Sequence, residues 1–150
     1  MRENPEGGFT IVELLVVVTI VGILTSIAIP KFRAVKRRAT ATQIVGDFDV
    51  VRHAAMSFFV DSGYFPPEAG SGATPRNLGP YLPSGFKFTR SDWMMDYENW
   101  PTGGVGGATV IGVSFTTKDQ QLGATAMSLL GNSPIFTSGT KKYTVVISGM

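Results

Sequence analysis

Hydrophobic residues dominate one long stretch near the N-terminus. Residues 9–30 comprise 22 positions, and Glu13 is the only charged residue among them. At ~1.5 Å of rise per residue, a helix of that length extends about 33 Å, which is enough to cross a hydrocarbon core ~30 Å thick. The pattern therefore predicts a membrane-spanning helix from Phe9 to Ile29.

Beyond Pro30 the pattern becomes amphipathic, because apolar positions recur at steps of three and four with polar residues between them. We predict a single helix from about Phe9 to about Val60, with Pro30 as a kink and not a stop. Its apolar stripe, which we expect to pack on a folded domain, is Phe32, Val35, Ala39, Thr42, Val45, Phe48, Val51, Ala55 and Phe58.

The remainder of the chain predicts a small α+β domain. Residues 63–85 are rich in Gly and Pro and read as a long loop. Four short runs are typical of strands, at residues 86–89, 93–97, 110–116 and 143–148. Between the last two, residues 119–131 predict a short helix capped by Asp119 and ended by Gly131. We expect a small antiparallel sheet packed on the amphipathic helix.

Composition argues against catalysis. The chain has no cysteine and a single histidine, His53, which we expect on the surface of the helix. Disulfides, thiolate metal sites and Cys nucleophiles are therefore excluded. No nucleophile with a His base, no metal-ligand set and no Gly-rich loop between strand and helix is present, so we expect no enzyme.

No cofactor is expected, with one weak candidate site for Ca²⁺. Asp92, Asp96 and Glu98 lie close together in the sequence SDWMMDYENW, and hard cations bind carboxylate oxygens. Their spacing matches no EF-hand loop. The alternative interpretation places these carboxylates at the solvent edge of a strand.

Charge is unevenly distributed. Residues 31–38 (KFRAVKRR) hold five of the thirteen basic side chains. Residues 39–150 hold seven basic and eight acidic residues, a net charge of −1, so we do not expect this part to bind nucleic acid. The basic cluster would normally flank the cytoplasmic end of a membrane helix. If residues 31–38 lie outside the cytoplasm instead, we expect this basic cluster to contact anionic lipid headgroups or acidic residues of other subunits.

The N-terminal residues suggest proteolytic processing. A secretory signal has its small-residue cleavage site after the apolar run, whereas here Gly7 and Gly8 precede it. Cleavage after Gly8 would keep the helix and create a new amine on Phe9. With a pKa near 8, that amine is largely cationic at neutral pH and is a suitable partner for Glu13.

The stretch GGFTIVELLVVVTIVGILTSIAIP resembles the N-terminus of type IV pilins and type II secretion pseudopilins. The resemblance implies cleavage between Gly8 and Phe9, followed by N-methylation of Phe9. It also implies that Glu13 pairs with the amine of a neighbouring subunit, and that Pro30 kinks the helix. Gly22 and Pro30 would bound a stretch that can unwind in the filament, while we expect a continuous helix in the isolated subunit.

The resulting prediction is a structural filament subunit with a pilin fold. Residues 1–8 would be a removed leader, 9–30 the transmembrane and filament-core helix, 31–62 its amphipathic half, and 63–150 the α+β head. Expected partners are copies of itself and related pilins, a prepilin peptidase/methyltransferase, an inner-membrane assembly platform and membrane lipid. The precursor would lie in the bacterial inner membrane with its head outside the cytoplasm, before entering a periplasmic or cell-surface filament.

Several alternatives remain open at this point. The absent cysteines and the sequence GYFPP at residues 63–67 favour a type II secretion pseudopilin, whereas a head without a clear calcium loop favours a major or minor type IV pilus subunit. A single-pass membrane protein that does not polymerise and whose head binds a ligand is a different class. The hypothesis of a DNA-uptake pilin is weakened by the net charge of −1 on residues 39–150.

Overall fold

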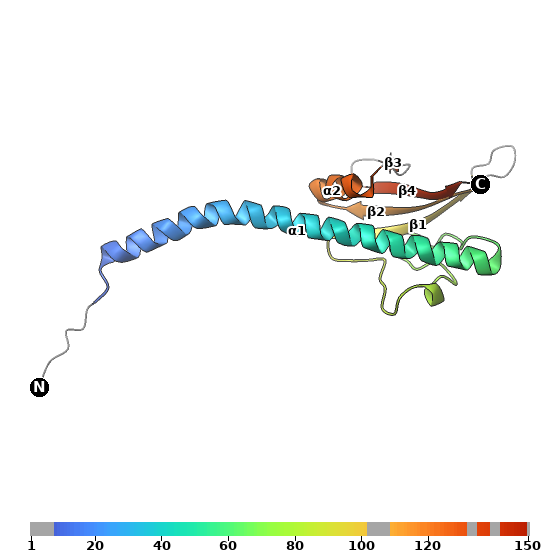
Figure 1. Cartoon of the computed structure of the whole chain (residues 1–150), viewed down its shortest axis with the longest axis horizontal. Coiled ribbons are helices and arrows are strands. Elements are labelled where there is room, and N and C mark those ends of the chain that lie inside the picture. The colour runs from blue at the N-terminus through green and yellow to red at the C-terminus, as the bar shows by residue number, and fades with distance from the viewer. Residues whose placement is uncertain (1–7, 102–108, 132–134, 139–141, 150) are drawn as a thin grey trace, which may run out of the picture. The chain divides into compact units, whose positions relative to one another are not determined.

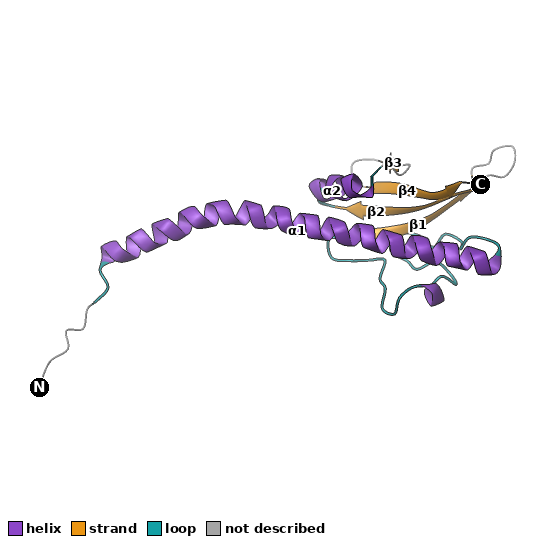
Figure 2. Cartoon of the chain, in the orientation of Figure 1, coloured by secondary structure: helices purple, strands orange, loops and turns teal. Residues whose placement is uncertain are grey.

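The computed structural model describes residues 8–101, 109–131, 135–138 and 142–149. Two compact units divide the chain, one ending at Lys36 and the other beginning at Arg37. Figure 2 distinguishes the helices from the strands. The described elements in chain order are helix α1 (Ile11–Ser62), the 3-10 turn η1 (Gly79–Tyr81), strand β1 (Trp93–Pro101), strand β2 (Thr109–Thr117), helix α2 (Gln120–Leu130), strand β3 (Ile135–Ser138) and strand β4 (Lys142–Gly149).

The first unit contains the apolar part of α1, which continues through Pro30 as predicted. By length and composition α1 can cross a membrane, since its most apolar 18-residue window has a mean hydropathy of 2.6 and is 0% buried. Two hydroxyls in this stretch bond to the helix backbone: Thr19 Oγ1 donates to Leu15 O and Ser26 Oγ donates to Ile23 O, both at 2.7 Å. Such bonds satisfy polar groups where water is absent.

The second unit is built on an antiparallel sheet with the strand order β1-β2-β4-β3 (Figure 1). β2 is central and pairs with β1 over its full length, from Trp93 opposite Thr117 to Pro101 opposite Thr109. One face of the sheet contributes apolar residues to the core, together with α1 and α2. These sheet residues include Met95, Tyr97, Ile111, Val113, Phe115, Tyr143 and Val145.

The buried stripe of α1 in this unit differs from the predicted one. It consists of Ala41, Ile44, Phe48, Val51, Ala54, Ala55 and Phe58. The predicted positions Phe32, Val35, Ala39 and Thr42 are exposed instead. The predicted positions Phe48, Val51, Ala55 and Phe58 are buried as expected. The N-terminal part of the prediction failed because Thr42, Val45 and Phe48 follow one another at steps of three, and each such step turns about 60° around the helix at 3.6 residues per turn. Ala41 and Ile44 precede Phe48 by seven and four residues and therefore share its face.

The strand predictions were correct for the three longest strands and wrong for two others. Residues 86–89 form no strand, and only Thr89 makes an isolated bridge, with Met94. β3 was not predicted; it pairs with β4 from Ile135 opposite Val145 to Ser138 opposite Lys142. The helix α2 begins after Asp119 and ends before Gly131, as expected.

The long connection between α1 and β1 is held against the outer edge of β1. Gly72 N donates to Met95 O at 2.8 Å, and Met95 N donates to Phe88 O at 2.7 Å. Gly72 has a φ of +78°, and a Cβ there would lie 2.6 Å from Thr89 Oγ1, so this close approach requires glycine. The edge strand is thereby covered along part of its length.

Candidate functional site

The residues before α1 form a local network around Glu13. Thr10 N and Thr10 Oγ1 both donate to Glu13 Oε2, at 3.0 and 2.8 Å. In return, Glu13 N donates to Thr10 Oγ1 at 3.2 Å. Thr10 is therefore the N-cap of the helix and Glu13 its third residue, which is the reciprocal arrangement of a capping box.

This network gives Glu13 a role in the unprocessed chain. Its carboxylate starts the helix by satisfying an N–H group that would otherwise lack a partner. We did not single out Thr10 from the sequence, although the signal was present: a Thr followed three residues later by a Glu, directly ahead of an apolar run, is typical of a helix start.

The predicted cleavage site is accessible. Gly8 is exposed and Phe9 is 76% exposed, so both can be reached by a peptidase. A Cβ added at Gly8 would meet nothing within 4 Å, so a requirement for glycine would come from the processing enzyme and not from this chain. The leader residues 1–7 lie outside the described residues, and the processing roles of Gly8 and Phe9 stay predictions.

Gly22 and Pro30 lie within the continuous helix α1. Gly22 has open space around it, since no described atom lies within 4 Å of an added Cβ. The expected continuous helix of the isolated chain is thus present, whereas unwinding between these residues concerns the filament and stays a prediction.

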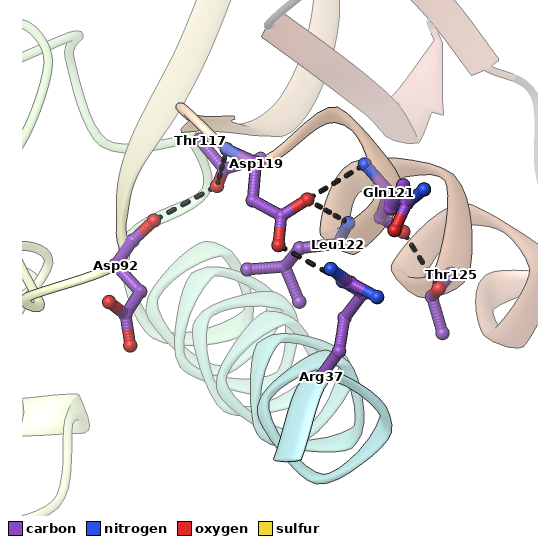
Figure 3. Close-up of polar contacts among 7 residues, drawn as sticks. All are labelled: Arg37, Asp92, Thr117, Asp119, Gln121, Leu122 and Thr125. Atoms are coloured by element: carbon purple, nitrogen blue, oxygen red, sulfur yellow. Dashed lines mark hydrogen bonds and ion pairs between the residues drawn. The ribbon is translucent and has the colours of Figure 1, made fainter. Parts of the chain in front are cut away.

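Part of the basic cluster serves the second unit. Arg37 Nε donates to Asp119 Oδ2 at 3.0 Å (Figure 3). Asp119 Oδ1 accepts from Gln121 N at 2.9 Å and Leu122 N at 3.1 Å, so Asp119 caps α2 as predicted. The hydrogen bond from Arg37 lowers the pKa of the Asp119 carboxyl, and the bonds from the helix N–H groups act in the same direction. Arg37 therefore ties α1 to the start of α2.

Two of the three candidate calcium ligands, Asp96 and Glu98, are brought together, and Asp92 is not. Asp92 is exposed, and its backbone carbonyl accepts from Thr117 Oγ1 at 2.9 Å (Figure 3). Asp96 and Glu98 are buried, with exposed fractions of 5% and 2%. The expectation that they occupy a solvent edge is wrong: as alternate residues of β1 they share one face of the sheet, and both are buried there.

A lysine from β4 pairs with both buried carboxylates. Lys142 Nζ contacts Asp96 Oδ2 at 3.4 Å and also pairs with Glu98 Oε1. Ser114 Oγ donates to the same Glu98 oxygen at 2.5 Å. Burial raises the pKa of Asp96, and the negative charge of Glu98 raises it further. Burial opposes the charge on Lys142, but the hydrogen bond and charge of Glu98 outweigh it and raise the Lys142 pKa.

The contacts of Lys142 bear on the calcium expectation. Among the described residues no group of three metal-ligating side chains gathers, and the ammonium of Lys142 contacts both carboxylates. Calcium binding by Asp92, Asp96 and Glu98 stays a prediction, and a cation between the latter two would compete with Lys142.

The sequence of this chain is similar to several known proteins. Residues 4–29 match the family model described as the prokaryotic N-terminal methylation motif. The chain is 37% identical over 72 residues to a fimbrial protein of Pseudomonas aeruginosa, covering 48% of this chain and 44% of that protein. It is 32% identical over 66 residues to type II secretion system core protein G of Klebsiella michiganensis, covering 44% and 46%.

The fold has a solved neighbour. The major type IV pilin PilA1 from Clostridium difficile aligns with a TM-score of 0.50 and 17% identity, covering 74% of this chain and 96% of that one. The sequence matches span less than half the length of the two relatives above. The described elements thus have the architecture of a type IV pilin.

Proposed function

We propose that this type IV pilin-like chain is a structural subunit of a type IV pilus-like or type II secretion pseudopilus filament, assembled through α1 after removal of residues 1–8. One observation carries the proposal. The uncovered apolar part of α1 begins at Ile11, shortly after the Gly8–Phe9 bond, and Glu13, the only charged residue among residues 9–30, lies in its first turn.

The apolar face of α1 needs a partner in every state of the protein. Exposed fractions along it run from 80% at Ile11 to 46% at Ile29, far more apolar surface than soluble monomers expose in one patch. In the precursor that partner is membrane lipid. In the filament it is the same helix of other copies, so extraction exchanges lipid contacts for helix contacts and little apolar surface meets water.

Processing changes what Glu13 can bind. In the uncut chain Phe9 N is part of a peptide bond, and Glu13 is occupied by Thr10. Both bonds from Thr10 end on Oε2, so the second oxygen, Oε1, is available to the Phe9 amine of a neighbouring subunit. The cap and the intersubunit pair can then coexist, and the carboxylate helps to set the axial register of the filament.

The remaining partners belong to the same proposal. A prepilin peptidase/methyltransferase would act at Gly8 and Phe9, and an inner-membrane platform would drive extraction. The head would lie outside the cytoplasm. A reporter active only in the periplasm, fused after Met150, should then be active; activity of only a cytoplasmic reporter would reverse this orientation and support the positive-inside interpretation of residues 31–38.

The proposal is tested by changing Glu13 to Gln. Loss of the charge should favour the membrane pool by ~2 kcal/mol, and an amine without its counter-charge in the filament core typically costs ~3–5 kcal/mol. We therefore expect normal processing and insertion but a large loss of sheared filaments relative to membrane-bound mature subunit.

Two further variants separate pairing from capping. Thr10→Val removes the capping hydroxyl and leaves the Glu13 carboxylate, so filament yield should stay near that of the wild type. Glu68→Gln removes an exposed carboxylate of the head and should have no effect. Equal filament yield for Glu13→Gln and wild type would refute the pairing. Absence of filaments from the wild type would favour the alternative of a membrane protein that does not polymerise.

A further inference from the structure

Two basic residues stand directly beyond the apolar span. Lys31 and Arg33 follow Ile29 by two and four residues, which places them about 3 and about 6 Å further along α1 at ~1.5 Å per residue. The polar layer of a bilayer is roughly 5–7.5 Å thick on each side. This is half the difference between a total thickness of ~40–45 Å and a hydrocarbon core of ~30 Å. When Phe9–Ile29 spans the hydrocarbon, both charges lie at the depth of the lipid phosphates.

Neither of these side chains has a partner in the part of the chain that the structure describes. Lys31 and Arg33 are exposed, and the ion pairs formed among the described residues involve Arg37, Arg90 and Lys142 instead. Their neighbours Phe32 and Val35 are 71% and 69% exposed. Interleaved apolar and basic side chains are typical of residues at a membrane surface, where apolar stems meet lipid and charges meet headgroups.

The distribution around the helix axis favours lipid over a protein partner. With 3.6 residues per turn, Lys31 and Arg33 project about 200° apart. A protein surface packs on one side of a helix, and a helix lying flat on a membrane collects its basic residues on one face. A helix that passes through the headgroup layer meets phosphates on all sides. Opposed charges therefore match a helix that crosses that layer.

We propose that Lys31 and Arg33 bind the phosphates of anionic phospholipids where α1 leaves the membrane, and so hold the subunit in lipid before assembly. The inference rests on the membrane-inserted precursor of the proposed function. It also accounts for basic residues on the outer flank, which the positive-inside rule disfavours. Each basic side chain near an anionic surface contributes about 1 kcal/mol, or about a fivefold preference for anionic lipid.

The local lipid composition can be measured at Ala34, which is exposed between the two basic residues and Val35. Because the chain has no cysteine, Ala34→Cys gives a single site for a bimane fluorophore. The labelled full chain is placed in nanodiscs that contain the same fraction of brominated phosphatidylglycerol or brominated phosphatidylcholine. Bromine quenches the fluorophore on contact, so the ratio of the two quenching signals reports lipid enrichment around residue 34.

We expect stronger quenching by brominated phosphatidylglycerol. The double change Lys31→Gln and Arg33→Gln should bring the ratio down severalfold towards one, and high salt should act in the same direction. A matched control carries Arg76→Gln and Lys87→Gln, which remove two exposed charges of the head and should leave the ratio unchanged.

Four results would overturn the proposal. Equal quenching by the two lipids in the labelled parent refutes lipid selectivity, as does a ratio that the double change does not alter. Energy transfer between labelled copies that the double change abolishes, without any lipid preference, would assign these residues to an acidic surface of a second copy. No quenching by either lipid would mean that the chain is not inserted, which refutes the membrane step of the proposed function as well. If the quenching ratio is as expected but the protein forms no filaments, the result supports lipid binding and refutes only the filament assembly of the proposed function.

Discussion

Replacement of Lys142 by Met should destabilise the head strongly. The Met side chain keeps an apolar stem of similar length and removes the ammonium that contacts Asp96 and Glu98. Both carboxylates are at least 95% buried, and Asp96 Oδ1 already lacks a hydrogen-bond partner among the described residues. After the change, two like charges would share a closed site with only the Ser114 hydroxyl as a described donor.

The magnitude follows from burial. Breaking a buried ion pair by removing one partner typically costs ~3–5 kcal/mol. Lys142 is 34% exposed, so water already screens part of the interaction, and the bond from Ser114 remains. We therefore expect the lower end of the range, about 3 kcal/mol at neutral pH.

The loss should shrink in acid. Asp96 has a pKa raised above its ordinary value of 3.8, so the folded state binds this proton more tightly than the unfolded state. A group of this kind contributes stability below its unfolded pKa and loses that contribution as pH rises through the folded pKa. Lys142 normally lowers the Asp96 pKa. Without Lys142 the pKa should rise further, and mild acid should neutralise the site.

The assay is urea unfolding of the full chain in detergent, followed by tryptophan fluorescence. Trp93 is 3% exposed and belongs to the hydrophobic core of the head, so it reports on unfolding of the head. Lys87→Met, which removes an exposed charge, should change stability by less than ~0.5 kcal/mol. A Lys142→Met chain as stable as wild type at neutral pH, or a deficit that does not change with pH, would refute this account of the buried pair.

Three further predictions concern α1 and α2. Gly123→Ala should destabilise the head by ~1–3 kcal/mol, because a Cβ at Gly123 would overlap the ring of Tyr143. Gly46 has open space around it, so Gly46→Ala should stabilise α1 by ~0.5–1 kcal/mol. Urea unfolding measures the stability change of both variants, and changes of the same sign would contradict the close packing of Gly123 on Tyr143. Asp119→Ala should cost about 1 kcal/mol at neutral pH. Since the Asp119 pKa is lowered, its stabilisation exists above the unfolded pKa and fades as pH falls through the folded one, so the variant and wild type should converge in strong acid.

Local features were predictable from sequence where one period or one motif decides them. The length of α1, its passage through Pro30 and the cap at Asp119 depend on neighbouring residues alone. The Thr10–Glu13 box is equally local, since a Thr followed three residues later by a Glu is its complete sequence signature. The buried stripe was predicted correctly from Phe48 onward, whereas before Phe48 the steps of three through Thr42 and Val45 drift off the face that Ala41, Ile44 and Phe48 share.

Features that depend on distant partners could not be predicted. Asp96 and Glu98 alternate on a strand and carry charge, so the sequence alone favours exposure. Lys142, which contacts both carboxylates, lies 46 residues beyond Asp96 in the sequence. The two residues come close because β1 and β4 lie on either side of β2, one strand apart. Arg37 likewise bonds to Asp119, 82 residues away. This pairing depends on the tertiary fold and could not be predicted from the basic cluster that contains Arg37.

The measurement that tests the central claim most directly is the intact mass of this chain in sheared filaments. The account predicts filaments that contain a subunit of 142 residues, the 150 of the full chain less the eight of the leader, beginning at an N-methylated Phe9. A filament fraction that lacks the chain, or one in which the chain retains Met1, would contradict assembly through a processed α1.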